Sequence, residues 1–169
     1  LATGERWEKR GKRMDEQIAI LRGLMGGDYF GFKGDFYDIP ELKLCPVPSH
    51  PVPILIGGHS KLALKRAAKL GDGWISAGIS LEETKEFIDQ INSFREEFGT
   101  LDHPNYQFQV MGEAAYSPDG VRALEDLGAT EVIVAFRNAY EGGPDERTLD
   151  SMKAEIAWYA DEVISKFRN

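Results

Sequence analysis

A single cysteine, Cys45, occurs among the 169 residues. The chain therefore has no partner for an internal disulfide and no cysteine cluster that would bind zinc or an iron–sulfur centre. It also lacks both an uninterrupted apolar run of the ~18 residues that a membrane helix needs and a basic-then-apolar leader. We therefore expect a cytoplasmic protein with no membrane partner.

Basic residues are not in excess either. The 28 acidic residues outnumber the 20 basic ones, which gives a formal net charge of −8. Proteins that bind nucleic acid need clustered Lys and Arg to replace the counterions of the phosphate backbone. Here the cationic residues near the start of the chain, such as Arg10 and Lys12, are interleaved with acidic ones such as Glu8, as on a solvated helix face. We expect no nucleic-acid partner.

Histidine is also sparse. His50, His59 and His103 are the three histidines, and their spacing from one another and from Cys45 matches no metal-ligand pattern. His50 and His103 lie in proline-containing connectors, so solvated side chains are expected there. We place no metal site in this sequence.

The chain does contain enough apolar residues for one core. With 42% apolar content, a chain of this length can bury roughly two thirds of its unfolded surface, so a single domain over 1–169 is expected. Apolar residues such as Met14, Ile18 and Leu21 recur at helical spacing from Trp7 to Met25. This spacing predicts an amphipathic helix.

Two irregular segments follow this helix. Aromatic residues on both sides of Lys33-Gly34-Asp35 predict a short hairpin insertion over 28–39 with glycine at its turn. Five prolines between residues 40 and 53 deny the backbone both donors and helical geometry. The segment 40–53 is therefore predicted to be an extended connector.

From residue 54 onward, short apolar runs alternate with longer helical patterns. Such alternation predicts successive βα units and a parallel sheet. The third predicted strand alternates between apolar and polar residues, whereas the fourth is almost entirely apolar. The predicted elements are strand 54–57, helix 60–70, strand 73–77, helix 81–98, strand 106–112, helix 118–127, strand 131–136 and helix 148–167.

The first of these units has the features of an anion site. Residues 54–56 are apolar without alternation, as in a parallel strand that is covered on both faces. Gly57-Gly58 allows a tight turn and close approach of a ligand to the backbone. Ser60 is a good N-cap, and the free N–H groups of the helix that follows would point outward from the same end of the sheet. A phosphate would fit there.

Several segments occur in a fixed order: Arg13–Leu24, Phe32–Tyr37, Pro46–Pro48, Pro53–Ser60 and Arg66–Trp74. As an ordered set they resemble the luciferase-like flavin oxidoreductases, TIM-barrel-like (βα) proteins that use FMN or the deazaflavin coenzyme F420. In those relatives the matching turn contributes to the site for the phosphate side of the cofactor. The resemblance therefore implies cofactor contacts for Gly57, Gly58, His59 and Ser60. For His59 a surface or packing role stays open beside a direct one.

The resemblance covers only part of the family's barrel. That barrel has eight strands, and this chain supplies four that resemble its C-terminal half, preceded by a helix and a hairpin insertion. In relatives the other strands form much of the isoalloxazine pocket and the substrate site, so the resemblance implies an incomplete catalytic centre and assigns no catalytic residue. Because Leu1 falls where the family has a loop, we favour a fragment or split half of an enzyme over a half-barrel that pairs with a copy of itself.

Four strands taken from a closed barrel would leave two unpaired edges. They would also expose an inner face, which we expect to carry Ile, Val, Leu and Phe. Both features favour pairing with another chain. We therefore expect association, either with a missing N-terminal half or as a homo-oligomer.

Further candidates follow from position, because functional groups of (βα) barrels lie where strands run into the next loops. Ser76 and Gly78 follow the second predicted strand and are candidates for the substrate side. Glu113 follows the third strand and Arg137 the fourth. Either could reach a polar cofactor group, or form a salt bridge across the rim.

The function that the resemblance implies is hydride transfer with F420, or oxygen insertion with FMN, on a small organic substrate. The Gly-Gly-His-Ser form and the Pro-Val-Pro segment that precedes it favour F420. Relatives that oxidise sugar phosphates carry a cation where this chain has Ile79, which disfavours such a substrate.

Two alternatives stay open. One is a non-catalytic half-barrel that acts as an assembly or regulatory partner. The other is a doubly wound domain that binds a nucleotide at Gly57-Gly58, although these glycines lack the full Gly-x-Gly-x-x-Gly spacing.

Overall fold

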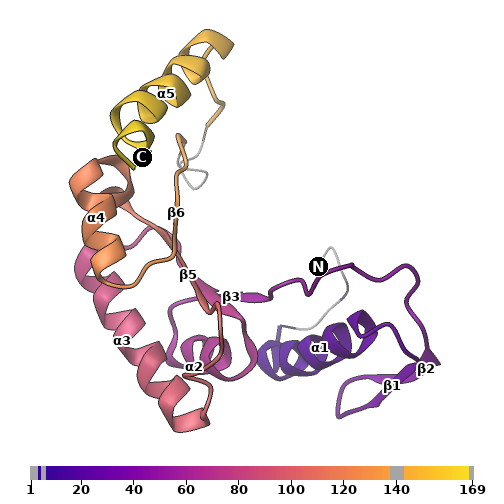
Figure 1. Cartoon of the computed structure of the whole chain (residues 1–169). Helices are drawn as coiled ribbons and strands as arrows, with labels where there is room; N and C mark the ends of the chain where they lie inside the picture. Colours follow the sequence, from indigo (N-terminus) through magenta and orange to yellow (C-terminus); the bar gives the residue numbers. More distant parts are fainter. Residues whose placement is uncertain (1–3, 5–6, 138–142, 168–169) are drawn as a thin grey trace.

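The computed structural model describes residues 4, 7–137 and 143–167. Its centre is a four-stranded parallel sheet in the order β3-β4-β5-β6, in which each strand pairs with its neighbour in sequence. Helices α2, α3 and α4 follow one another along one side of the sheet, with the β1–β2 hairpin and α1 beyond β3 and α5 beyond β6 (Figure 1). The elements are α1 Arg10–Met25, β1 Phe30–Lys33, β2 Asp38–Leu42, β3 Leu55–Gly57, α2 Lys61–Leu70, β4 Gly73–Ile75, α3 Leu81–Phe98, β5 Gln107–Met111, the 3-10 helix η1 Glu113–Tyr116, α4 Pro118–Asp126, β6 Glu131–Ile133, α5 Leu149–Glu162 and the 3-10 helix η2 Ile164–Phe167.

The sequential strand order bears on one alternative. A doubly wound domain binds its nucleotide where the strand order reverses. In the described sheet the order never reverses, so it has no such switch point. The alternative interpretation as a doubly wound nucleotide-binding domain is therefore wrong.

The core lies between the sheet and its helices. In-register residues on neighbouring strands, such as Ile56, Trp74 and Phe108, point toward the helices and are buried. They meet apolar residues of α2 and α3, among them Leu64 and Ile91. Burying one such side chain contributes about 1.5–3 kcal/mol, so this layer is the main source of stability.

The other face of the sheet differs from expectation. Because side chains alternate along a strand, Ile75, Gln107, Gln109 and Glu131 lie on the face opposite the helices. Gln109 donates from Nε2 to the Glu131 carboxylate at 2.6 Å. By the same alternation Leu55, Met111 and Ile133 also lie on this face. The face is therefore mixed, and not the uniformly apolar one predicted.

Local signals account for the helix ends. Ser60 and Ser117 cap α2 and α4 by accepting from the amides three residues ahead. Ser80 and Glu83 form a capping box at the start of α3, which ends at Gly99 with φ 68°. These caps explain why the predicted helix bounds agree closely with the structure.

The N-terminal elements differ more from the prediction. Helix α1 begins at Arg10, not at Trp7, and buries Ile18 and Ile20 while Met14 and Leu21 are exposed. Ile18 was predicted on the apolar stripe, whereas Ile20 lies outside it, because one side of α1 faces the hairpin and another faces α2.

The hairpin is antiparallel, and β2 continues through Pro40 to Leu42, past the predicted limit at 39 and into the predicted connector. Its turn is held by the Glu16 carboxylate of α1. This carboxylate accepts from the amides of Asp35, Phe36 and Tyr37 at 2.8–3.1 Å. The hairpin is thus fastened to α1 and does not project freely.

The amino ends of the strands meet at Asp72. Its carboxylate accepts from the Ile54 amide at 2.7 Å and from Arg22 at 2.9 Å, and lies 3.4 Å from Nε2 of His103. His103 is exposed, as expected from its connector, and its ring also lies beside this carboxylate. No helix in the described ranges is both long and apolar enough to span a bilayer.

Candidate functional site

The turn after β3 is held in shape by its neighbours. Gly58 has φ 112°, a value that favours glycine, and its carbonyl accepts from Nε1 of the buried Trp74 at 3.0 Å. Ser60 then begins α2, with its Oγ accepting from the Ala63 amide at 3.3 Å and its carbonyl from the Leu64 amide at 3.0 Å. The turn therefore has one defined backbone path.

This path leaves a row of donors unused. Within the described residues, the amide N–H groups of residues 58–62 donate to no acceptor. Gly58, His59, Ser60, Lys61 and Leu62 are also exposed. The N-terminus of a helix carries a partial positive charge, so the donors here suit an anion such as a phosphate.

The His59 side chain is exposed but also contacts neighbouring elements. Its ring stacks on Phe87 of α3, with centroids 5.2 Å apart and an interplanar angle of 16°, and lies 6.0 Å from the Trp74 ring. Its Nε2 accepts from the Ala77 amide at 3.3 Å. The side chain thus joins the β3 turn to α3 and to the loop after β4.

Ser76 was predicted on the substrate side, but the structure gives its hydroxyl another use. The side chain is 3% exposed. Its Oγ accepts from the Met111 amide at 2.9 Å and donates to the Met111 carbonyl at 3.4 Å. These bonds join the carboxyl ends of β4 and β5.

Gly78 and Glu113 are both exposed in the loops that follow. Gly78 has φ 60°, with open space where a Cβ would lie, and Glu113 begins η1 directly after Gly112. A Cβ on Gly112 would come within 2.3 Å of the Ile79 carbonyl oxygen. The loops after β4 and β5 are therefore in close contact, with Gly78 and Glu113 facing solvent.

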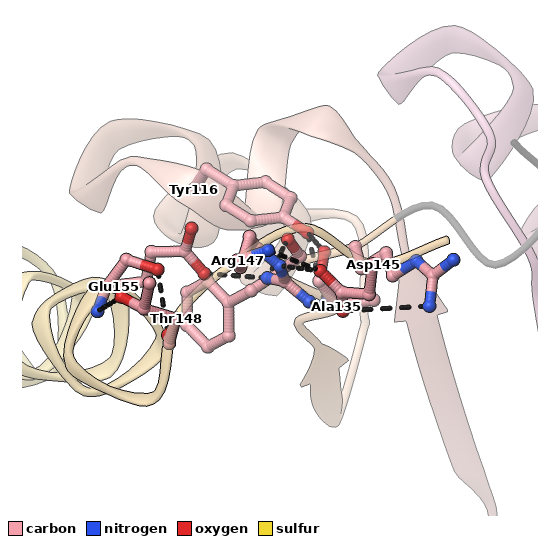
Figure 2. A network of polar contacts seen from close by, with 9 residues as sticks. Tyr116, Ala135, Asp145, Arg147, Thr148 and Glu155 are labelled. Carbon is pink, nitrogen blue, oxygen red and sulfur yellow. Dashed lines mark hydrogen bonds and ion pairs between the residues drawn. The ribbon is translucent and has the colours of Figure 1, made fainter. Parts of the chain in front are cut away.

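At the carboxyl end of β6, Arg147 organises the connection to α5. Figure 2 shows its guanidinium among Asp145, Glu155 and the backbone that follows β6. It donates from Nε and an Nη to the two Asp145 oxygens, and from the other Nη to Glu155 at 2.8 Å and to the Phe136 carbonyl at 2.7 Å. The hydrogen bonds from Arg147 hold the pKa of the Asp145 carboxyl well below its usual range, and the same pair raises the pKa of Arg147.

Arg137 belongs to the same cluster. It donates to the Gly143 carbonyl at 2.9 Å and lies 3.6 Å from Asp145. Arg137 thus pairs with a carboxylate of its own β6–α5 connection and not with one across the rim. Sequence reasoning missed Asp145 and Arg147, and only their position just before the N-cap Thr148 could have drawn attention to them.

The carboxyl edge of the sheet presents unused backbone donors and loops that are fixed by hydrogen bonds. Backbone donors at the β3 turn, the His59–Phe87 stack and the fastened loops lie at the carboxyl ends of the strands. In the parts of the chain that the structure describes, no group of three or more His, Cys, Asp or Glu side chains could hold a metal ion.

Comparison with known proteins gives matches along almost the whole chain. A family model described as luciferase-like monooxygenase matches residues 2–162. An uncharacterized protein of Mycobacterium tuberculosis is 44% identical over 96% of this chain and 56% of its own length. The F420-dependent hydroxymycolic acid dehydrogenase of the same organism is 30% identical over 88% of this chain and 46% of its own length.

Other relatives carry a different cofactor in their names. An FMNH(2)-dependent dimethylsulfone monooxygenase of Pseudomonas fluorescens is 37% identical over 54% of this chain and 26% of its own length. Among solved structures, the coenzyme F420-dependent tetrahydromethanopterin reductase from Methanopyrus kandleri superposes with a TM-score of 0.64 at 13% identity, over 94% of this chain and 64% of that chain. The chain spans about half the length of the curated relatives that it matches most fully.

Proposed function

Because the chain belongs to the luciferase-like monooxygenase family, we propose that it supplies the phosphate side of a cofactor site in an oxidoreductase that uses coenzyme F420 or FMN. Its parallel sheet and covering helices correspond to part of the TIM barrel of these enzymes. When bound, the cofactor would supply the hydride transfer or oxygen chemistry. The described residues of this chain would bind and orient it.

The unused donors at residues 58–62 carry the proposal. A phosphate placed at this turn would receive hydrogen bonds from amides that have no acceptor among the described residues, next to the positive end of α2. A Cβ on Gly57 would make only ordinary contacts with Ile75, at 3.5 Å from its side chain and 3.9 Å from its carbonyl oxygen, and Gly58 holds a conformation that side chains disfavour. The turn therefore lets a ligand reach the backbone closely.

One observation supports F420 over FMN: the turn has the Gly-Gly-His-Ser form, preceded by the Pro-Val-Pro segment 46–48. Relatives of both cofactor types match this chain, at 30% identity for the F420-dependent dehydrogenase and 37% for the FMNH(2)-dependent monooxygenase. For the substrate we propose a small organic molecule other than a sugar phosphate, because the buried, apolar Ile79 offers no charge to a phosphate.

Titration of the protein with F420 and with FMN, followed by fluorescence and calorimetry, tests the cofactor. We expect F420 to bind more tightly than FMN, and inorganic phosphate to compete with it. Tighter binding of FMN would reverse the choice of cofactor. Binding of neither, even after the barrel has been completed, would favour a non-catalytic half-barrel that serves as an assembly or regulatory partner.

We also propose that the sheet pairs with strands outside the described residues. Within the described ranges, β3 and β6 each have a single neighbour, so each leaves one edge unpaired. Exposed apolar side chains on α5, including Ile156 at 59% and Trp158 at 49%, add to the uncovered surface. The N-terminal half of the barrel is the partner we favour over a second copy.

Light scattering and binding of a hydrophobic dye test this association. We expect the isolated chain to self-associate or to bind dye strongly. Addition of the N-terminal half of the 44% identical mycobacterial relative should suppress both effects. A stable monomer with little dye binding would contradict the proposal.

A further inference from the structure

His59 makes contacts that its place in the sequence does not suggest. It follows Gly58 on the β3 turn, yet its ring lies on Phe87, 5.2 Å away between centroids and nearly parallel to it. Its Nε2 accepts a hydrogen bond from the Ala77 amide at 3.3 Å. One side chain therefore contacts both the helix and the loop that follow the next strand.

The Ala77 bond determines where the imidazole carries its proton. A ring nitrogen that accepts from an N–H group must present a lone pair. In neutral His59 the proton therefore lies on Nδ1, and Nε2 is the acceptor. The backbone of the β4 loop thus selects one of the two tautomers.

The loop held in this way is itself fixed. Ser76, next to Ala77, is 3% exposed and uses its hydroxyl on the backbone of Met111. The Ile79 amide donates to the Met111 carbonyl at 3.2 Å. The loop after β4 is therefore a rigid support for whatever its amides hold, since β5 anchors it on both sides of Ala77.

The β3 turn also has a hydrogen bond to strand β4 itself. Nε1 of Trp74 donates to the Gly58 carbonyl at 3.0 Å, which fixes the peptide group just before His59. The Trp74 bond and the His59–Ala77 bond bracket the Gly58–His59 peptide. Together they determine how the amides of residues 58–62 are presented.

We propose that His59 is a positioning residue, which in its Nδ1–H tautomer fastens the anion-facing turn of β3 to the loop after β4. This role rests on the proposed function in so far as the turn binds the cofactor phosphate. In this role the His59 side chain orients the backbone donors of the turn. It also links the turn to the loop of residues 76–80, which is proposed to face the substrate.

The tautomer can be measured directly. Long-range nitrogen–proton correlation spectra of the labelled protein, recorded where the ring is neutral, should show the His59 proton on Nδ1 and an unprotonated Nε2. The amide hydrogen of Ala77 should exchange with solvent more slowly than the amide hydrogens of other exposed loops. A proton on Nε2, or fast exchange at Ala77, would overturn the proposal whether or not any ligand binds.

Two substitutions separate the acceptor from the ring. His59→Phe keeps an aromatic ring for Phe87 but removes the acceptor, and His59→Gln removes the ring but keeps an oxygen that can accept from Ala77. We expect His59→Phe to speed Ala77 exchange and to weaken F420 binding about five- to tenfold, which is the scale of one lost hydrogen bond. His59→Gln should recover most of both. His50→Phe, in the exposed connector, is the matched control and should change neither.

The outcomes distinguish this inference from the proposed function. Unchanged Ala77 exchange and unchanged F420 affinity in His59→Phe, with a folded circular dichroism spectrum, would refute the positioning role. If the wild-type chain binds neither F420 nor inorganic phosphate, the proposed function fails. The tautomer and the exchange rates then still decide the role of His59.

Discussion

Arg147 holds Asp145 through two parallel hydrogen bonds, from Nε to Oδ1 at 3.0 Å and from an Nη to Oδ2 at 2.9 Å. The same guanidinium reaches the Phe136 carbonyl and Glu155, so it joins the end of β6 to the start of α5. At the other side of the sheet, His59 and Trp74 join the β3 turn to β4. The carboxyl edge of the sheet is thus fastened near both of its ends.

Asp145→Asn should make the protein less stable, and the loss should depend on pH. Arg147 holds the pKa of the Asp145 carboxyl below its ordinary value, so the unfolded chain takes up this proton before the folded one does. The contribution of the pair is therefore fully present above the ordinary Asp pKa of about 3.9, and is lost as pH falls through the folded value.

Thermal unfolding of the wild type and of Asp145→Asn from neutral to acidic pH measures this effect. The difference in Tm should stay constant down to about pH 4 and shrink below it. Asp119→Asn, which removes the exposed pair with Arg122, should change Tm little at any pH. A difference that already disappears at neutral pH would contradict the assignment.

Ser60→Ala should lower stability and weaken anion binding together. It removes the cap that accepts from the Ala63 amide, at a cost of about 1 kcal/mol in the free energy of unfolding. Ser117→Ala removes the equivalent cap of α4 and serves as its control. Chemical denaturation should show similar losses for both, whereas calorimetry with F420 should show weaker binding for Ser60→Ala alone. Equal binding by the two variants would argue against an anion at the start of α2.

Alanine at the two glycines of the turn should have unequal effects. Gly58 has φ 112° and lies 3.1 Å from Ala63 when given a Cβ, so Gly58→Ala should cost about 1–3 kcal/mol of folding free energy. At Gly57 a Cβ would make an ordinary contact at 3.5 Å with Ile75, so Gly57→Ala should be nearly neutral for stability. Urea denaturation of both variants checks this order. A larger loss at Gly57 would mean that the turn has another conformation.

Tyr159→Phe should destabilise the packing of α5. The buried Tyr159 hydroxyl donates to the Ala115 carbonyl at 2.8 Å, and burial raises the pKa of this tyrosine. Removing the donor leaves a buried carbonyl without that bond, which costs about 1–3 kcal/mol. Tyr29→Phe, at a side chain that is 72% exposed, is the control and should leave the denaturation midpoint unchanged. Equal midpoints for all three proteins would contradict the anchoring role of Tyr159.

The elements from residue 54 onward could be predicted because their signals are local. The capping box at Ser80 and Glu83 and the glycine at Gly99 mark the ends of α3 within the sequence itself. Strand ends were predicted less well: β6 stops at Ile133, although the apolar run continues to Phe136. A strand extends only as far as its neighbour pairs with it, and β5 ends at Met111, opposite Ile133.

The residues of the candidate site also differ in how far local sequence signals predict them. Gly58 and Ser60 could be predicted from residue type, because a positive φ and a helix cap each restrict the choice of residue. The burial of Ser76 could not be assigned, because the Met111 backbone that uses its hydroxyl comes from the next strand along the chain. The Asp145–Arg147 pair was missed because neither residue belongs to a motif.

By itself, the sequence determined the family, the succession of strands and helices, and the glycine turn with its serine cap at the start of α2. These follow from periodicity, caps and glycines, which act over a few neighbouring residues. The tertiary structure alone decided that Ala77 meets His59, that Glu131 and Gln109 share the open face of the sheet, and that Arg147 joins β6 to α5. These contacts depend on strand register and on the packing of distant segments, which local patterns do not specify.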